Sequence, residues 1–286
     1  MTHIRKVGLI GLGTLGKPMA KNLVKAGFDL AVYDVREAPM KELEAAGATP
    51  CASASELAAR SEVLISMVLN IIQTEEVVFG SQGVTASVRP GTKLVIGSTI
   101  GPGPMRKIAQ ALEPKGVTLI DAAMAGGYPA AEKGTLTVMV GGDPEVLDEV
   151  MPVLRAVGST ILRAGAVGTA QAAKLANNLT QAINIIALLE GLALGMAAGV
   201  ESKTLKEILR KSSANSYVLE VWDKLGPRWK KRLARRTPED QVPNLCKDLR
   251  LAVDFARELG VPLPVGSLAS ALWEGGIATG HEDPRI

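Results

Sequence analysis

The sequence predicts an α/β fold in two parts: a doubly wound, mostly parallel sheet, then an all-α domain entered through one long helix. Three observations support this prediction. Short apolar runs alternate with helical patterns up to about residue 164, the strand signal then disappears, and a glycine-rich turn follows the first run. Alternation of strands and helices is typical of βαβ units, which build parallel sheets.

Periodicity places the elements of the first part. Runs with the length and β-branching of buried strands lie at residues 7–10, 30–33, 63–68, 94–96, 117–120 and 137–140. Helical patterns lie between them at 14–26, 36–46, 74–79 and 102–113. The turn Gly141-Gly142-Asp143-Pro144 predicts one more helix after the last run.

The second part has only helical patterns, at residues 168–200, 203–211, 216–233, 244–259 and 265–279. We therefore predict two domains, a dinucleotide-binding domain at 1–164 and an all-helical substrate and oligomerisation domain at 165–286. Gly191, Gly195 and Gly199 share one face of the long helix, which fits either tight helix packing within the chain or a dimer seam. Asn184 and Glu190 interrupt its most apolar stretch, so a buried helix is favoured over a membrane span.

Composition excludes several classes of protein. The net charge of the 286 residues is only +3 and aromatic residues make up 3%, which argues against a nucleic-acid-coating surface. The dense basic run 229–236 is interpreted as a solvated helix face. Two cysteines and two histidines support neither a disulfide framework nor a metal site. The N-terminus does not resemble a signal peptide, so we expect a cytoplasmic protein that binds neither nucleic acid nor membrane.

A GxGxxG motif lies between the first strand and the first helix. It consists of Gly11, Leu12, Gly13, Thr14, Leu15 and Gly16. The first glycine permits the tight turn, the second lets the backbone approach a pyrophosphate, and the third lets the helix pack on the sheet. The N–H groups at the helix N-terminus then face the phosphates. The motif predicts a Rossmann-type dinucleotide site with these six residues in contact with the cofactor.

Asp34 ends the second strand, where a carboxylate can accept both hydroxyls of an adenosine ribose and repel a 2′-phosphate. This position favours NAD as the cofactor. Arg36 lies two residues later and could receive the 2′-phosphate of NADP instead, so NADP stays an alternative. Asp34 could also be a turn or capping residue without a ligand.

Lys174 lies within an otherwise apolar helix, and Asn178 follows four residues later on the same helix face. A lysine amine at the edge of an apolar site can exchange protons near neutrality. An asparagine beside it can orient a hydroxyl or a carboxylate. Spacing alone favours a lysine that extends its amine to solvent beside an incidental neighbour.

Four segments together resemble the β-hydroxyacid dehydrogenase family, the relatives of 3-hydroxyisobutyrate dehydrogenase. They are the glycine-rich opening at 8–20, the segment at 121–127 with its companion at 134–142, the helix at 168–178, and the lysine motif at 247–252. The resemblance extends over most of the chain, in the expected order. It implies an NAD(P)-dependent oxidoreductase.

The resemblance also implies roles for individual residues. Lys174 would be the general acid/base that takes the hydroxyl proton as hydride leaves the same carbon. The substrate would contact Ser98, Ala125, Gly126, Gly127 and Asn178. The cofactor would further contact Leu69, Asn70, Thr99 and Lys247. Lys247 could instead be a surface lysine paired with Asp248.

The chain departs from the family pattern at its substrate segment. The family usually has serine where this chain has Ala125, and often proline where it has Ala123. One side-chain hydrogen bond to a substrate carboxylate would then be missing, and Tyr128 is a candidate substitute donor. This difference leaves the substrate open.

The leading hypothesis is an enzyme that interconverts a small 3-hydroxy acid and its semialdehyde, and the resemblance implies a homodimer or homotetramer. An imine reductase-like enzyme is an alternative, although such relatives generally replace the lysine. A non-catalytic dinucleotide-binding sensor or scaffold is another, although it need not retain Lys174, Asn178 and the paired glycines together.

Overall fold

The computed structural model describes residues 4–224, 226 and 244–275. Its backbone divides into two compact units, which we call the sheet unit, Met1–Lys174, and the helical unit, Leu175–Ile286. The division falls inside the long helix rather than ahead of it, and the functional domains 1–164 and 165–286 stay a prediction. The basic run 229–236 and the ends of the helices predicted at 216–233 and 265–279 lie outside the described residues.

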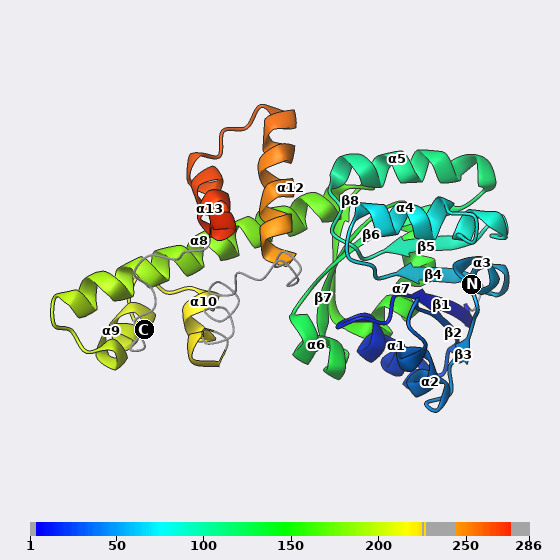
Figure 1. The fold of residues 1–286 in the computed structure, drawn as a ribbon, viewed down its shortest axis with the longest axis horizontal. Coiled ribbons are helices and arrows are strands. Elements are labelled where there is room, and N and C mark those ends of the chain that lie inside the picture. The colour runs from blue at the N-terminus through cyan, green and yellow to red at the C-terminus, as the bar shows by residue number, and fades with distance from the viewer. Residues whose placement is uncertain (1–3, 225, 227–243, 276–286) are drawn as a thin grey trace. The chain divides into compact units, whose positions relative to one another are not determined.

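The sheet unit is built on an eight-stranded sheet with the order β3-β2-β1-β4-β5-β6-β7-β8 (Figure 1). The strands are β1 (Lys6–Ile10), β2 (Asp29–Tyr33), β3 (Thr49–Pro50), β4 (Val63–Ser66), β5 (Lys93–Ile96), β6 (Thr118–Ala125), β7 (Leu136–Gly141) and β8 (Gly158–Gly165). Every neighbouring pair is parallel except β6 and β7, which are antiparallel. The predicted doubly wound, mostly parallel sheet is confirmed.

Two strands, β3 and β8, were not among the predicted runs. β3 has only two residues, too few for a periodic signal. β8 lies at the end of the sheet, and most of its side chains are exposed, so it lacks the apolar character of a central strand. Strand β6 also runs on to Ala125, five residues beyond the predicted end at Ile120, because its second half pairs with β7.

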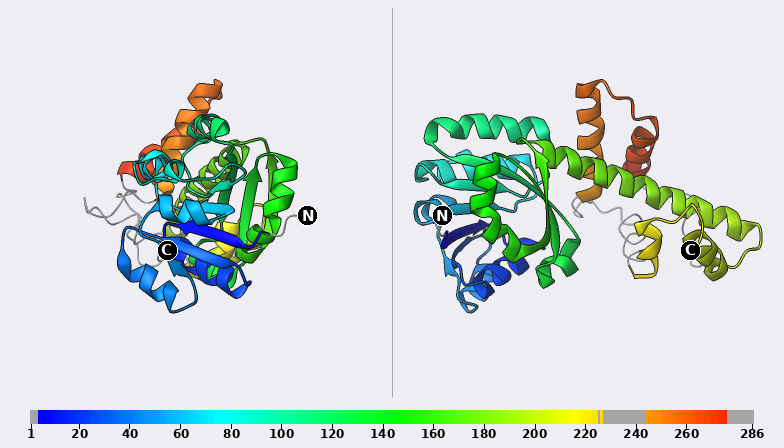
Figure 2. Two further views of the ribbon diagram at one scale, coloured as in Figure 1. Left: turned by 90° about the vertical axis from the view of Figure 1, so that its right-hand side faces the viewer. Right: turned by 180° about the vertical axis from the view of Figure 1, so that it is seen from behind.

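Helices cover both faces of the sheet (Figures 1 and 2). They are α1 (Gly16–Lys25), α2 (Glu37–Glu44), α3 (Ala54–Arg60), α4 (Ile71–Phe79), α5 (Pro102–Leu112), α6 (Gly127–Lys133) and α7 (Pro144–Val157), with 3₁₀ turns η1 (Val84–Ala86) and η2 (Glu113–Lys115). The core on one face takes buried side chains from α1, α2, α6 and α7. The core on the other face takes them from α3, α4 and α5. Apolar residues that alternate along β1 supply both cores, as a doubly wound sheet requires.

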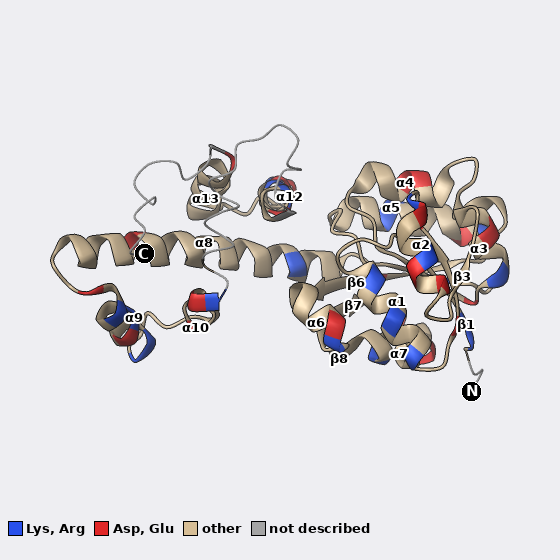
Figure 3. Ribbon diagram, turned by 60° about the horizontal axis from the view of Figure 1, so that its bottom comes forward, with Lys and Arg blue, Asp and Glu red and all other residues tan. Residues whose placement is uncertain are grey.

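The helical unit contains most of α8 (Thr169–Ala197), with α9 (Ser202–Arg210), α10 (Tyr217–Glu220), α12 (Asn244–Leu259) and α13 (Pro264–Gly275). Helix α8 is mostly free of charge in Figure 3, and by length and composition it could cross a membrane. Its buried residues Ala182, Ile185, Leu189 and Leu192 instead share one core with Trp222, Cys246, Leu249 and Trp273. One face of α8 therefore packs into the core of this unit, whereas only 33% of its apolar window is buried, so the helix is less buried than the sequence predicts.

The small-residue face of α8 is in part explained by packing within the chain. A Cβ added at Gly195 would contact a methyl carbon of Leu205 in α9, so a larger residue would require the Leu205 side chain to shift. Cβ atoms at Gly191 and Gly199 would meet no atom within 4 Å. Tight helix packing therefore accounts for Gly195, and the described contacts of Gly191 give no packing reason for a glycine there. Gly199 lies beyond the end of α8 with φ +91°, which favours glycine, so the predicted three-glycine helix face is wrong at this position.

Candidate dinucleotide and substrate site

The predicted cofactor residues follow the carboxyl ends of four neighbouring parallel strands. The turn 11–16 follows β1, Asp34 follows β2, Leu69 and Asn70 follow β4, and Thr99 follows β5. The strand order reverses between β1 and β4, and open α/β sheets bind ligands at such a switch point. The sheet therefore brings these residues to one edge.

The glycine-rich turn has two glycines that its own packing requires and one that it does not. Gly11 has φ +90°, and a Cβ there would lie 2.6 Å from the carbonyl oxygen of Met67. A Cβ at Gly16 would lie 1.9 Å from the carbonyl oxygen of Gly11. A Cβ at Gly13 would meet no atom within 4 Å, so Gly13 borders open space where a phosphate can approach the backbone.

The start of α1 fits an anionic ligand. Within this described helix no side chain caps the N-terminus at Leu15, and the first turn contains no acidic residue. Unpaired N–H groups and the positive end of the helix dipole favour a phosphate at such a position. The residues present therefore fit the pyrophosphate of a dinucleotide.

Asp34 is 7% exposed and accepts four hydrogen bonds. Its Oδ1 accepts from the backbone N–H and the Nε of Arg36, at 3.0 and 2.8 Å. Its Oδ2 accepts from the backbone N–H of Leu12 at 2.7 Å and from Nη2 of Arg36 at 3.0 Å. Asp34 thus stabilises both its own turn and, through Leu12, the glycine-rich turn. Because four donors already occupy this carboxylate, a ribose hydroxyl that binds it has to replace one of them.

The charge of Asp34 is stabilised where it lies. Burial by itself would raise the pKa of this carboxyl, but the guanidinium of Arg36 and the backbone N–H groups of Arg36 and Leu12 lower it below its ordinary value. The carboxylate in turn raises the pKa of Arg36. The Arg36 side chain is 59% exposed, so the pair presents a guanidinium at the surface over a buried carboxylate.

The two residues after β4 form a helix cap. Asn70 is the N-cap of α4, and its Oδ1 accepts from the N–H of Gln73 at 2.9 Å. Oε1 of Gln73 accepts from the N–H of Leu69 at 2.9 Å. The segment is held in place by this reciprocal cap, and the Asn70 side chain has a structural partner in addition to its predicted cofactor role.

The predicted substrate segment lies where β6 ends and α6 begins. Ala125 is the last residue of β6, opposite Thr137 of β7. Gly126 and Gly127 have φ +118° and +65°, which favours glycine at both positions. The hydroxyl of Tyr128 donates to Oε1 of Glu132 at 3.1 Å in the same helix, so the structure gives this candidate donor another partner.

Two residues without a predicted role connect the start of α8 to this sheet edge. Asp121 and Gln171 are both fully buried, and Nε2 of Gln171 donates to Oδ1 of Asp121 at 2.9 Å. Burial raises the pKa of Asp121, while hydrogen bonds from Gln171, Gly168 and Ala170 oppose the rise. Lys174 is half-buried, one turn beyond Gln171 in α8. The 50 residues that separate the pair explain why spacing in the sequence did not reveal it.

Asn178 and Lys247 meet through Asp248 in the helical unit. Nδ2 of Asn178 donates to Oδ2 of Asp248 at 2.6 Å, and Nζ of Lys247 lies 2.9 Å from Oδ1 of Asp248. The ion pair that we gave as the alternative for Lys247 is therefore present, with the lysine 25% exposed. Asp248 therefore holds the side chains of both Asn178 and Lys247.

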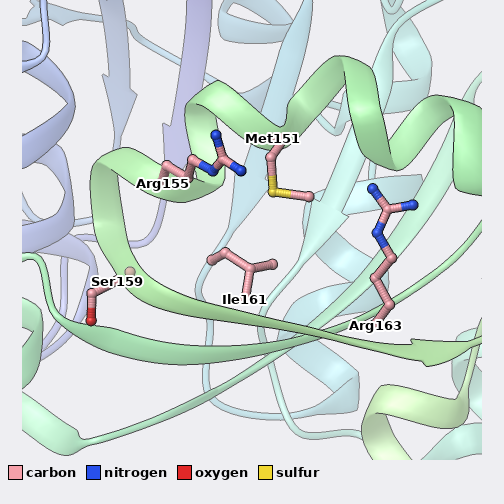
Figure 4. A pocket seen from close by; sticks show the side chains of 6 residues that line it. Met151, Arg155, Ser159, Ile161 and Arg163 are labelled. Atoms are coloured by element: carbon pink, nitrogen blue, oxygen red, sulfur yellow. The ribbon is translucent and has the colours of Figure 1, made fainter.

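A hollow of about 610 Å³ lies between α7 and β8, away from these residues (Figure 4). Met151, Arg155, Ser159, Ile161 and Arg163 line it, and Arg163 is ion-paired with Asp148. It contains none of the predicted site residues. In the described part of the chain no group of three or more His, Cys, Asp or Glu residues is placed to hold a metal ion.

Two protein families match the chain, one in each half. The NAD binding domain of 6-phosphogluconate dehydrogenase matches residues 6–168. The NAD-binding domain of NADP-dependent 3-hydroxyisobutyrate dehydrogenase matches residues 168–284.

Curated relatives match along nearly the whole chain. An NAD-dependent L-serine dehydrogenase of Pseudomonas aeruginosa is 38% identical over 272 residues, which are 94% of this chain and 91% of the relative. A 2-(hydroxymethyl)glutarate dehydrogenase of Eubacterium barkeri is 36% identical over 96% of this chain and 90% of the relative. A mitochondrial 3-hydroxyisobutyrate dehydrogenase of Mus musculus is 34% identical over 93% and 80%.

Solved structures show the same fold. A Mycobacterium tuberculosis 3-hydroxyisobutyrate dehydrogenase, determined with L-serine, has a TM-score of 0.86 at 28% identity and covers 98% of this chain and 96% of its own. An imine reductase of Myxococcus stipitatus has a TM-score of 0.69 at 16% identity over 97% and 95%, a likeness that shows the fold alone. Together with the nucleotide-binding geometry, these matches show that the chain belongs to the β-hydroxyacid dehydrogenase family and is an NAD(P)-dependent dehydrogenase.

Proposed function

We propose that the chain interconverts a small 3-hydroxy acid and its semialdehyde, with Lys174 as the general acid/base. The observation that carries this proposal is the placement of the α8 start. Gln171, one turn before Lys174, accepts hydrogen bonds from Ile100 and Gly101, directly after Ser98 and Thr99 at the carboxyl end of β5. The lysine is thereby attached to the same sheet edge as the glycine-rich turn.

The names of the relatives narrow the substrate class. L-Serine, 2-(hydroxymethyl)glutarate and 3-hydroxyisobutyrate are named in the matched dehydrogenases. All three are 3-hydroxypropanoates that differ only in the substituent at C2, so each has a primary alcohol and a carboxylate at a fixed separation. We propose a 2-substituted 3-hydroxypropanoate as the substrate of this chain.

In the proposed mechanism Lys174 exchanges a proton with the substrate hydroxyl, and backbone N–H groups bind the substrate carboxylate. In the oxidation direction the neutral amine of Lys174 takes the hydroxyl proton, and in reduction its ammonium returns it. The bound nicotinamide supplies the chemistry of hydride transfer. The N–H groups at Gly126 and Gly127 hold the substrate carboxylate, Asn178 orients the substrate, and Ser98, whose buried Oγ has no hydrogen-bond partner among the described residues, is a further donor.

Ala125 distinguishes this chain within the proposed mechanism. It provides no hydroxyl, and Tyr128 donates to Glu132, so the carboxylate depends on the backbone donors and Ser98. A missing hydrogen bond to a charged group weakens binding by about 1.5–3 kcal/mol. We therefore expect 3-hydroxypropanoate without a C2 substituent to bind weakly. The C2 substituent should make a larger contribution to the binding free energy of the substrate.

The cofactor follows from the Asp34–Arg36 pair. Asp34 supports NAD because a carboxylate at this position repels a 2′-phosphate, and Arg36 supports NADP because its exposed guanidinium can pair with one. We propose that the enzyme prefers NAD and also accepts NADP. The resemblance supports Lys247, which is ion-paired with Asp248, as a further residue that contacts the cofactor.

The cellular location, the partners and the oligomeric state of the enzyme can also be proposed. We propose a soluble, cytoplasmic homodimer or homotetramer that binds a small hydroxy acid rather than nucleic acid or membrane. Exposed apolar side chains on the helical unit, such as Leu194 at 75% and Leu268 at 61%, support an interface between subunits there.

Steady-state kinetics on the purified protein test the proposed function. Nicotinamide absorbance is followed with L-serine, 3-hydroxyisobutyrate and 2-(hydroxymethyl)glutarate, each with NAD and with NADP, and with cyclic imines as the competing class. We expect turnover of at least one hydroxy acid, and a kcat lowered by about 10²–10⁴-fold in Lys174→Ala. Turnover of imines alone would support the imine reductase alternative, and cofactor binding without any turnover would support a sensor.

A further inference from the structure

The network around Asp121 and Gln171 uses all the hydrogen-bonding capacity of a buried amide. Oε1 of Gln171 accepts from the backbone N–H of Ile100 at 2.9 Å and from that of Gly101 at 3.1 Å. Its Nε2 donates to Oδ1 of Asp121 at 2.9 Å and to the carbonyl of Ser98 at 3.2 Å. The amide cannot be reversed, because its NH₂ would then face two N–H donors.

Asp121 holds the start of α8 from the other side. Its Oδ2 accepts from the backbone N–H groups of Gly168 and Gln171, both at 3.0 Å. These are orphan donors at the helix N-terminus, so the carboxylate caps α8 and interacts favourably with its dipole. Gly168 has φ +95°, and a Cβ there would lie 3.1 Å from Arg106 and 3.2 Å from the Pro102 carbonyl, which keeps the entry to α8 close to α5.

Asp121 lies at a junction in the sheet. It is the last residue of β6 paired with β5, opposite Ile96, and the first paired with β7, opposite Gly141. The residues after it continue to Ala125 and the paired glycines. Asp121 therefore connects the strand that leads to the substrate segment with the helix that carries Lys174.

We propose that Asp121 and Gln171 form a buried clamp that positions Lys174 against the segment 98–101 for proton transfer. Neither residue touches the reacting atoms in this proposal, so both are positioning residues. The proposal rests on the proposed function, because it requires Lys174 to move a proton. The physical reason is that a displacement of about 1 Å at a catalytic group can lower the rate about 100-fold.

The first test is a double-mutant cycle. Gln171→Met removes the four side-chain hydrogen bonds while nearly conserving volume, and we expect kcat to fall at least about tenfold. The changes in the KM of the hydroxy acid and in the Kd of NADH should be smaller than the change in kcat. In a Lys174→Ala background the same substitution should change the residual kcat less than about twofold, because the clamp acts through the lysine. An equal loss in both backgrounds would overturn the proposal.

The second test exchanges the two functional groups. Gln171→Glu places a second carboxylate against Asp121. In Asp121→Asn, the side-chain oxygen still accepts from the N–H groups at the start of α8, and the new NH₂ then faces the NH₂ of Gln171. Each single variant therefore loses the hydrogen bond between residues 121 and 171. The double variant restores it in the opposite direction, and we expect its kcat to exceed that of either single variant about tenfold. Full recovery is not expected, because the Ser98 carbonyl loses its donor. A double variant no better than the worse single variant would contradict the clamp.

Hydrogen exchange supplies a readout that does not need activity. In Gln171→Met the amides of Ile100 and Gly101 should exchange faster than in the wild type, whereas Gln110→Met, the same change at an exposed position of α5, should leave them unchanged. Unchanged exchange in Gln171→Met would refute the clamp geometry.

If the wild type oxidises no hydroxy acid, the proposed function fails and the exchange data still decide the clamp. If the wild type is active and Gln171→Met behaves like Gln110→Met, the clamp fails alone.

Discussion

Lys174 is the residue on which the proposed chemistry depends. Lys174→Ala should lower kcat by about 10²–10⁴-fold, the usual contribution of positioned proton transfer. The Kd of NADH should stay within about twofold, because the amine acts on the substrate rather than on the cofactor. Stopped-flow kinetics and fluorescence titration check the two quantities, and Lys203→Ala, at an exposed position of α9, is the matched control. Comparable losses in rate and in cofactor affinity would make the lysine a structural residue.

Arg36 should decide how strongly the enzyme prefers NAD. Arg36→Ala frees both oxygens of Asp34 for the ribose and removes the guanidinium that can pair with a 2′-phosphate. A hydrogen bond to a charged group contributes about 1.5–3 kcal/mol, so kcat/KM for NADP should fall about 10- to 100-fold relative to NAD. Asp34→Ala should move the ratio in the opposite direction. Lys41→Ala is the control, and an unchanged ratio in both variants would remove this pair from the ribose site.

The Asp34 carboxyl also makes stability depend on pH. Its pKa in the folded chain lies below its ordinary value of 3.8, so the folded state binds fewer protons than the unfolded state as the pH falls through that range. The contribution to the free energy of unfolding is present above pH 3.8 and is lost below it. Asp34→Asn should lower Tm at pH 7, and the difference from wild type should shrink below pH 4. A difference that stays constant with pH would contradict the assignment.

At the scale of elements, two glycines of the β1–α1 turn should have different roles. Gly16 should matter for stability, and Gly13 for cofactor affinity. Gly16→Ala places a Cβ 1.9 Å from the Gly11 carbonyl, and such overpacking costs about 1–3 kcal/mol of stability. Gly13→Ala meets no atom of the chain, so Tm should be unchanged while the Kd of NADH rises at least about tenfold, because the methyl group occupies the path of the phosphates. Thermal unfolding and fluorescence titration measure both. A stable Gly13→Ala variant with wild-type affinity would exclude this turn as the phosphate site.

The prediction of elements succeeded where local signals were strong. The strands at β1, β2, β4 and β5 were found because central parallel strands are short apolar runs. Helices α5 and α12 were found because their periodicity is long, and α8 because its apolar stretch is too long for a strand. Helices α3 and α6 have seven residues each and were not predicted. The antiparallel pairing of β6 and β7 was not specified either, since both read as ordinary buried runs and strand direction depends on the connection between them.

At the scale of the whole molecule, the helical unit should hold the subunits together. Light scattering after size exclusion should give a dimer or tetramer mass at micromolar concentration. Leu194→Asp, at a position 75% exposed on α8, should shift the mass toward the monomer, because a charge in an apolar interface is costly. Ile72→Asp, 74% exposed on the sheet unit, should leave the mass unchanged. A wild-type monomer would refute the proposed assembly.

The sequence by itself determined the α/β and all-α parts and the glycine-rich turn, because each depends on neighbours within a few residues. The choice of Lys174 as the proposed acid/base came from the four segments that together resemble the family, not from its local spacing. The tertiary structure decided what surrounds them. The guanidinium of Arg36 donates to the carboxylate of Asp34. The same carboxylate accepts from the N–H of Leu12, 22 residues earlier in the glycine-rich turn. Gln171 meets Asp121 across 50 residues, and Asn178 meets Asp248 across 70. Such partners are set by how strands and helices pack, since buried polar groups must find donors and acceptors wherever the fold places them.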